Sequence, residues 1–175
     1  MKYIRKLKYY IAAIVVMAVP FSVVQQAAAY SGSGAGTAGS PYVITSCAQF
    51  AQINDELDAH YTLAQDIDCS GDGDAIKVTA GDFTGVLDGG GHTLTMQLTV
   101  ESGAWGELAL FGMLSGEVHN IRLAGSVTSD EDDGDGATAA LVAYSYQGTF
   151  SNIFSTVAVS DVGDIAGGLI GTLLS

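Results

Sequence analysis

Basic residues are scarce in this sequence and unevenly placed. The chain holds six Lys and Arg residues against nineteen Asp and Glu residues, and four of the six lie within the first eight positions. Beyond them, only Lys77 and Arg122 oppose all nineteen acids, which leaves a formal net charge of −17 if residues 1–29 are removed. A surface this acidic repels phosphate groups, so nucleic acid is excluded as a partner and anionic lipid is disfavoured.

The sequence also lacks a long unbroken apolar run. After its basic start, the apolar segment 9–24 contains Pro20 and is shorter than the ~20 residues of a membrane-spanning helix. A small-x-small pattern ends at Ala29, which predicts a signal peptide over residues 1–29, cleaved between Ala29 and Tyr30. A retained membrane anchor is the alternative. The mature chain is expected to be exported, extracellular or at the cell surface, without inserting into the membrane.

Only two cysteines occur, Cys47 and Cys69. In an exported protein such a pair predicts one disulfide, which would close a loop of about twenty residues and contribute ~3 kcal/mol in the chain-entropy model. A pair of metal ligands is the alternative, but there is no further cysteine and no suitably spaced histidine to complete such a site.

Familiar catalytic motifs are missing as well. The chain has no H-E-x-x-H, no G-x-S-x-G and no Cys–His arrangement. Glycoside hydrolysis needs two carboxylates on opposite sides of a bond, and nothing in the sequence selects two from the many acids. No catalytic residue is assigned and the chain is not expected to be an enzyme. A polysaccharide-acting enzyme, or the stalk of a larger surface enzyme, is kept as an alternative.

What the chain has in abundance is glycine, 23 residues that separate short apolar runs. This spacing is typical of short strands and tight turns. The segment 30–40, "YSGSGAGTAGS", is predicted to be a flexible linker by its composition. One short helix is predicted in "SCAQFAQINDEL", with Ser46 as N-cap and apolar residues at Phe50, Ile53 and Leu57.

The second half of the chain is self-similar at a period of about thirty residues. With one extra residue in the second copy, the matched positions are Gly116 with Gly148, Val118 with Phe150, Asn120 with Asn152, Ile121 with Ile153, and Val127 with Val159. Repeated strands too short to bury themselves indicate a solenoid. Because the runs are short, β-branched and glycine-punctuated, the predicted fold is an all-β parallel β-helix. Asn120 and Asn152 are expected to stack as a side-chain amide ladder at one corner.

Several segments, in this order, resemble bacterial surface proteins that carry GLUG repeats: "GTAGSPYVIT", "YTLAQDIDCSG", "FTGVLDGGGHTL", "LFGMLSGEVHNIRL" and "GGLIG". The resemblance runs from about Gly36 to the end of the chain. It implies a filamentous-haemagglutinin-like right-handed β-helix over residues 41–175, with the short helix as an N-terminal cap. The chain departs from the repeat at "ALVAYSY", where glycines are preferred, so the middle coil is expected to be irregular.

The chain stops on what resembles the opening of another coil. An open β-helix end presents unpaired strand edges, so the domain is predicted to be truncated at its C-terminal end. Packing of "GGLIGTLLS" as a makeshift cap is the alternative.

The stretch "LDGGGHTL" is the most conspicuous candidate site. Asp88 and His92 could form a catalytic pair, but no nucleophile or orienting group accompanies them. We interpret Asp88, Gly89, Gly90, Gly91 and His92 as a structural turn, in which the glycines supply positive φ so that one strand reverses into the next.

Two acidic clusters are candidates for a Ca²⁺ site, since Ca²⁺ takes six to eight oxygen ligands. The first contains Asp66, Asp68, Asp72 and Asp74, and the second lies in the loop from Asp130 to Asp135. Neither follows the EF-hand order or the nonapeptide calcium repeat, so a solvated acidic loop is the alternative. No other cofactor is expected.

The function expected from these patterns is a non-catalytic, adhesin-like scaffold at the cell surface, which presents loops to an unknown protein or carbohydrate ligand. A Ca²⁺-stabilised carbohydrate-binding module is the second interpretation.

Overall fold

The protein is an all-β solenoid of about three turns with a single short helix, as the sequence predicts. The structure, a computed structural model, describes residues 30–99, 108–129, 137–160 and 165–174. The predicted signal peptide and the acidic loop at 130–135 lie outside these ranges. Within them, no helix has the length and hydropathy needed to cross a bilayer.

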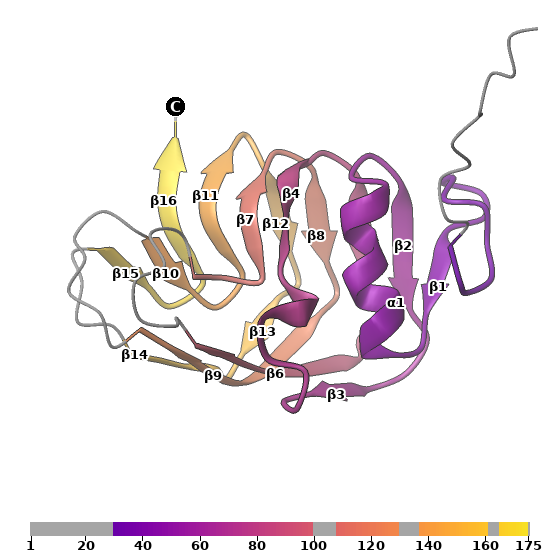
Figure 1. The fold of residues 1–175 in the computed structure, drawn as a ribbon. Coiled ribbons are helices and arrows are strands. Elements are labelled where there is room, and N and C mark those ends of the chain that lie inside the picture. Colours follow the sequence, from indigo (N-terminus) through magenta and orange to yellow (C-terminus); the bar gives the residue numbers. More distant parts are fainter. Residues whose placement is uncertain (1–29, 100–107, 130–136, 161–164, 175) are drawn as a thin grey trace, which may run out of the picture.

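Three parallel sheets form the walls of the solenoid (Figure 1). The first sheet contains β1 (Tyr42–Ile44), β2 (His60–Leu63), β5 (Val86–Asp88), β8 (Glu117–His119) and β12 (Thr149–Ser151). The second contains β3 (Ile67–Cys69), β6 (Thr93–Thr99), β9 (Arg122–Thr128), β13 (Phe154–Ser155) and β14 (Ala158–Ser160), the last two both pairing with β9. The third contains β4 (Val78–Phe83), β7 (Phe111–Leu114), β11 (Val142–Tyr146) and β16 (Ile170–Leu174). A separate parallel pair is formed by β10 (Ala137–Ala139) and β15 (Ile165–Gly167).

Inward side chains stack in register from coil to coil to make the core. In the first sheet Tyr61, Leu87 and Val118 occupy successive layers and are at most 1% exposed. Leu94 and Leu123 do the same in the second sheet. Alternate residues of β2, β3 and β6 are buried in this way, and burial of a Leu or Val side chain contributes about 1.5–3 kcal/mol.

A column of glycines turns the corner between the third sheet and the first. A Cβ on Gly85 would lie 2.1 Å from the Ala59 carbonyl oxygen, and one on Gly116 would lie 2.2 Å from the Gly85 carbonyl oxygen. Gly148 continues the column, and its Cβ would meet the Leu114 and Ser145 side chains at 2.7 Å. Gly85 and Gly116 are required because successive coils approach through their backbones at this corner, whereas side chains crowd Gly148.

The repeat predicted for the second half of the chain is confirmed in register. Phe150 pairs with Val118, and Val159 pairs with Val127. The extra residue falls between β11 and β12, where the offset between coils changes from 31 to 32 and Gln147 has φ +62°. The middle coil was expected to be irregular, but β11 pairs with β7 on one side and with β16 on the other. Small and apolar side chains are buried there in place of the glycines that the repeat prefers.

The helix lies at the N-terminal end of the solenoid, next to β1 and β3 (Figure 1). It comprises α1 (Cys47–Ala51), continued by the 3-10 turn η1 (Gln52–Asp55). Ser46 is the N-cap, and its hydroxyl accepts the Gln49 N–H at 3.3 Å. Phe50 and Ile53 are fully buried and close this end of the core. A second 3-10 turn, η2 (Gly73–Ile76), follows β3.

The segment 30–40 is not a flexible linker, which corrects the prediction from composition. It packs on the first strands through backbone hydrogen bonds, from Val43 N–H to Ser33 O at 2.8 Å and from His60 N–H to Gly36 O at 2.9 Å. A Cβ on Gly34, whose φ is +104°, would lie 2.0 Å from the Pro41 carbonyl oxygen. The glycines here permit close approach and positive φ rather than disorder.

Candidate functional site

The turn at residues 88–92 forms a corner between two sheets. It does not reverse the chain: β5 pairs with β2 and β8, and β6 with β3 and β9, so the predicted reversal of one strand into the next is wrong. Gly90 and Gly91 adopt φ of +59° and +78°, as a glycine turn requires. Asp88 Oδ1 accepts the Gly90 N–H at 2.9 Å, and the His92 N–H donates to Gly89 O at 2.9 Å.

A ladder of polar side chains rises from this corner through the next two coils. Asn152 Nδ2 donates to Asn120 Oδ1 at 2.8 Å, and Asn120 Nδ2 donates to Asp88 Oδ1 at 3.1 Å. Both asparagines have positive φ, +54° for Asn120 and +55° for Asn152. The sequence repeat did not predict Asp88 as a member of the ladder. In the strand register Asp88 aligns with His119, one residue before Asn120.

Substitution of Asn120 can separate the ladder from the backbone. Asn120→Gly keeps the left-handed conformation but removes the two ladder bonds and the contact with His119 Nδ1, so we expect a loss of about 1–2 kcal/mol in the free energy of unfolding. Asn120→Ala should lose about 1 kcal/mol more, because alanine disfavours positive φ. Urea unfolding of the two variants measures the difference. Equal losses would mean that position 120 is not left-handed in solution.

Two histidines lie next to carboxylates at this corner. His92 Nδ1 is 3.4 Å from Asp66 Oδ1, and His119 Nδ1 is 3.5 Å from Asp88 Oδ1. Both carboxylates already accept backbone N–H groups, Asp66 from Thr93 at 2.8 Å and Asp88 from Gly90. In the described part of the chain, no serine or threonine hydroxyl hydrogen-bonds to either imidazole. The pairs therefore close turns and do not form a nucleophile–base arrangement.

A surface pocket of about 310 Å³ lies against the ladder. It combines Gly91 of the turn, the two asparagines of the ladder, the first residues of β9 and β13, Arg122 and Phe154, and the residues just before them, Ile121 and Ile153. Phe154 pairs with Arg122 and Arg122 with Thr93, so these three side chains form an outward column. Phe154 is 59% exposed. No pattern in the sequence indicates this pocket, because its parts come from three successive coils.

The four acids of the first cluster do not converge. Asp66 faces His92, Asp68 Oδ1 accepts the Ser70 N–H at 3.0 Å, and Asp74 forms an ion pair with Lys77 at 2.9 Å. The backbone N–H of Ser70 is the first cause that holds the pKa of Asp68 below its ordinary value. Among the described residues, the one group with three ligand atoms within 4.8 Å contains Asp72 and the two cysteines instead.

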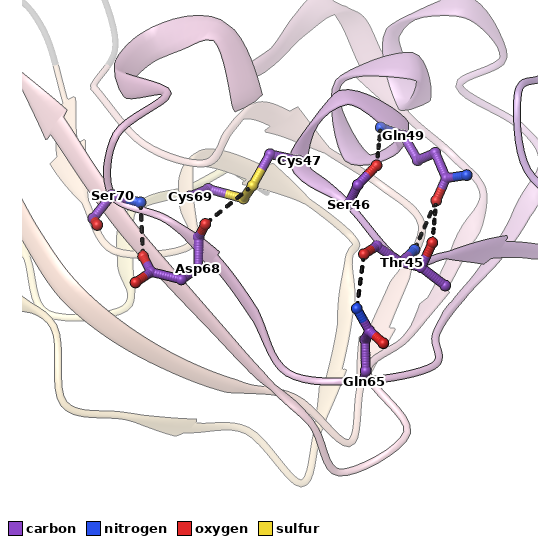
Figure 2. The surroundings of a disulfide bond; sticks show 8 residues. All are labelled: Thr45, Ser46, Cys47, Gln49, Gln65, Asp68, Cys69 and Ser70. Carbon is purple, nitrogen blue, oxygen red and sulfur yellow. Dashed lines mark hydrogen bonds between the residues drawn. A yellow bond between two sulfur atoms is a disulfide. The ribbon is translucent and has the colours of Figure 1, made fainter.

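The cysteines form the predicted disulfide (Figure 2). It joins Cys47, the first residue of α1, to Cys69, the last residue of β3, with a Cα–Cα distance of 5.6 Å. Oxidised sulfurs offer no thiolate, which is the form of cysteine that binds metal. The group of Asp72 and the two cysteines is therefore a structural link in the oxidised protein.

Three tyrosines cluster where segment 30–40 meets the solenoid. The rings of Tyr30 and Tyr42 stack with centroids 4.3 Å apart, and Tyr61 lies edge-on to Tyr30 at 6.2 Å. Burial raises the pKa of Tyr30 to about 12, with a smaller contribution from Tyr42. Burial, followed by the charge of Glu56, also raises the pKa of Tyr61.

These shifts predict a loss of stability at high pH. Unfolded tyrosines ionise near pH 10, so the contribution of Tyr30 is fully present below pH 10 and is lost as the pH rises toward about 12. We expect the melting temperature to fall across this interval in brief scans monitored by circular dichroism. Tyr30→Phe should flatten the fall, whereas Tyr146→Phe, at an exposed ring, should not. Parallel curves for Tyr30→Phe and the wild type would contradict the assignment.

The chain is 35% identical over 164 residues to halomucin of Haloquadratum walsbyi (strain DSM 16790 / HBSQ001), an alignment that covers 83% of this chain and 2% of halomucin. The chain thus spans a very small part of that protein's length. No family model matches the chain. No solved structure matches it.

Proposed function

We propose that this chain is a non-catalytic β-solenoid scaffold, exported to the cell surface, which presents its outer corners and loops for adhesion. The observation that carries the proposal is the way the polar groups are used. In the described part of the chain, the histidines and carboxylates at the corner around residues 88–92 are engaged in turn closure and in the side-chain ladder between coils. Stacked coils make a rigid body, and rigid repeats offer several contacts to one extended partner.

The disulfide and the similarity to halomucin support export. Disulfides persist in oxidising compartments and are rare in the cytosol, and this chain has no free cysteine among its described residues. The order of the sequence segments from "GTAGSPYVIT" to "GGLIG", which resembles that of GLUG-repeat surface proteins, also supports a surface role.

Surface exposure and adhesion can be tested on the full chain carrying a C-terminal epitope tag. We expect protease added to intact cells to remove the tag signal, and beads coated with the secreted protein to adhere to the same cells. A tag protected until the cells are lysed would contradict surface display. Coated beads that do not stay bound to the cells would contradict adhesion.

The expected lack of catalytic activity is tested by a separate measurement of polysaccharide cleavage. The secreted protein, incubated with polygalacturonate and with neutral polysaccharides, should release no new reducing ends. Their release by the wild type, and not by a heat-denatured sample, would overturn the scaffold proposal in favour of a polysaccharide-acting enzyme.

A further inference from the structure

Arg122 is a cation without an ion-pair partner among the described residues, in a chain dominated by acids. Its guanidinium makes no ion pair and no side-chain hydrogen bond with any described residue, although the chain contains nineteen Asp and Glu residues. Lys77, the other base beyond position 30, is paired with Asp74 at 2.9 Å. Arginine presents five N–H donors in a planar fork that matches a carboxylate. An exposed, unpaired guanidinium is therefore available to an anionic group from outside.

The described residues that line the pocket beside Arg122 carry no negative charge. The pocket beside it has no acidic lining residue. All described residues from 137 to 160 and from 165 to 174 are uncharged. Asp88, at the far end of the ladder, already accepts hydrogen bonds from Gly90 and Asn120. Among the described residues, the last two coils therefore add no negative charge beside Arg122, and a single anion can approach it.

The other walls of the pocket match a ring that is apolar on its face and polar at its rim. Phe154 stands one layer from Arg122 in the outward column, about 4.8 Å away along the sheet. Asn152 uses one N–H for the ladder, and its carbonyl oxygen accepts no hydrogen bond from a described residue. The volume of about 310 Å³ is at the small end of ligand pockets and is large enough for a single sugar ring.

We infer that this pocket binds an acidic sugar of the uronic acid class. The carboxylate lies on the Arg122 guanidinium, the C–H face of the ring lies against Phe154, and a ring hydroxyl donates to the amide oxygen of Asn152. This inference deepens the proposed function by naming the ligand of one corner. It can fail while the scaffold and its surface display stand, because neither depends on this pocket.

Titration of the secreted full chain with trigalacturonate, followed by NMR or calorimetry, tests the inference. We expect binding in the millimolar range or tighter, weakened at least about tenfold by Arg122→Gln through loss of a charged hydrogen-bonding pair. Lys77→Gln is the matched control, since it removes the same charge at a site already paired, and it should bind as the wild type does. The melting temperature of Arg122→Gln should be unchanged, which separates lost binding from lost folding.

Further ligands distinguish a sugar from a bare carboxylate. The methyl ester of trigalacturonate should bind about tenfold more weakly than the acid. Phe154→Ala should weaken the trisaccharide but not alter the much weaker response to acetate. The inference is overturned if Arg122→Gln and Lys77→Gln bind alike, if the ester equals the acid, if trialanine competes as well as trigalacturonate, or if no binding occurs.

Discussion

Alanine in place of Gly116 is expected to lower the free energy of unfolding by about 3 kcal/mol, the upper part of the usual range for overpacking. The added Cβ would lie 2.2 Å from the Gly85 carbonyl oxygen and 2.7 Å from the Thr84 carbonyl carbon. Both neighbours are backbone atoms. The Gly85 carbonyl is held by the Glu117 N–H at 2.9 Å, and β5 and β8 pair directly after the corner. Relief of the clash therefore requires separation of two coils rather than rotation of a side chain.

Gly112→Ala provides the matched control. Gly112 lies in β7, and a Cβ there would be 3.7 Å from Thr79 Cγ2, an ordinary contact. We expect its effect to remain within about 0.5 kcal/mol, or to stabilise slightly by restricting the unfolded chain. Urea unfolding followed by circular dichroism compares the two variants with the wild type. If the midpoint of Gly116→Ala equalled that of Gly112→Ala, successive coils would not meet as closely as the glycine column indicates.

Loss of the disulfide is the second large effect, at about 3 kcal/mol. The bridge closes a loop with a sequence separation of 22, for which the chain-entropy model gives this magnitude. It also holds the start of α1 against the end of β3, while the helix itself is only five residues long. Isolated helices of this length are not stable in water, so the bridge and the burial of Phe50 are needed to keep the N-terminal end of the core covered.

The double variant Cys47→Ala/Cys69→Ala, and the wild type in reductant, should both unfold at lower urea concentration than the oxidised wild type. Alanine is preferred at position 69 because Cys69 is fully buried and a serine hydroxyl there would need a new partner. Reductant should have no effect on the double variant. A wild type that unfolds at the same urea concentration with and without reductant would remove the disulfide from the account of stability.

Some of these features could be predicted because they recur at fixed spacing. A solenoid places equivalent residues directly above one another, so the match of Val118 with Phe150 in sequence became a register pair in the sheet. The helix and its N-cap were predictable because capping is local, with Ser46 acting on Gln49 three residues later. The disulfide followed from there being only two cysteines.

Other predictions were wrong because glycine has two structural roles: it permits a flexible or reversing backbone, and it permits the close approach of another segment. In segment 30–40 and in the turn at 88–92, glycine was interpreted as a source of flexibility or of chain reversal. In both places the neighbouring coil decides the outcome. Gly89, for example, would place a Cβ 2.5 Å from the Asn120 carbonyl oxygen, an atom more than thirty positions away in the chain.

The sequence by itself determined the class of fold, the register of its repeats and the partner of each cysteine, because these depend on periodicity and on counts. Only the tertiary structure decided which side chains meet at the corner. Asp88 joined the asparagine ladder, the first acidic cluster dispersed, and Arg122 was left beside Phe154 and Asn152. The physical reason is that these neighbours come from different coils. Their contact depends on the length of each turn and on the positive φ of a few corner residues. Neither property can be inferred from the spacing of residues along the chain.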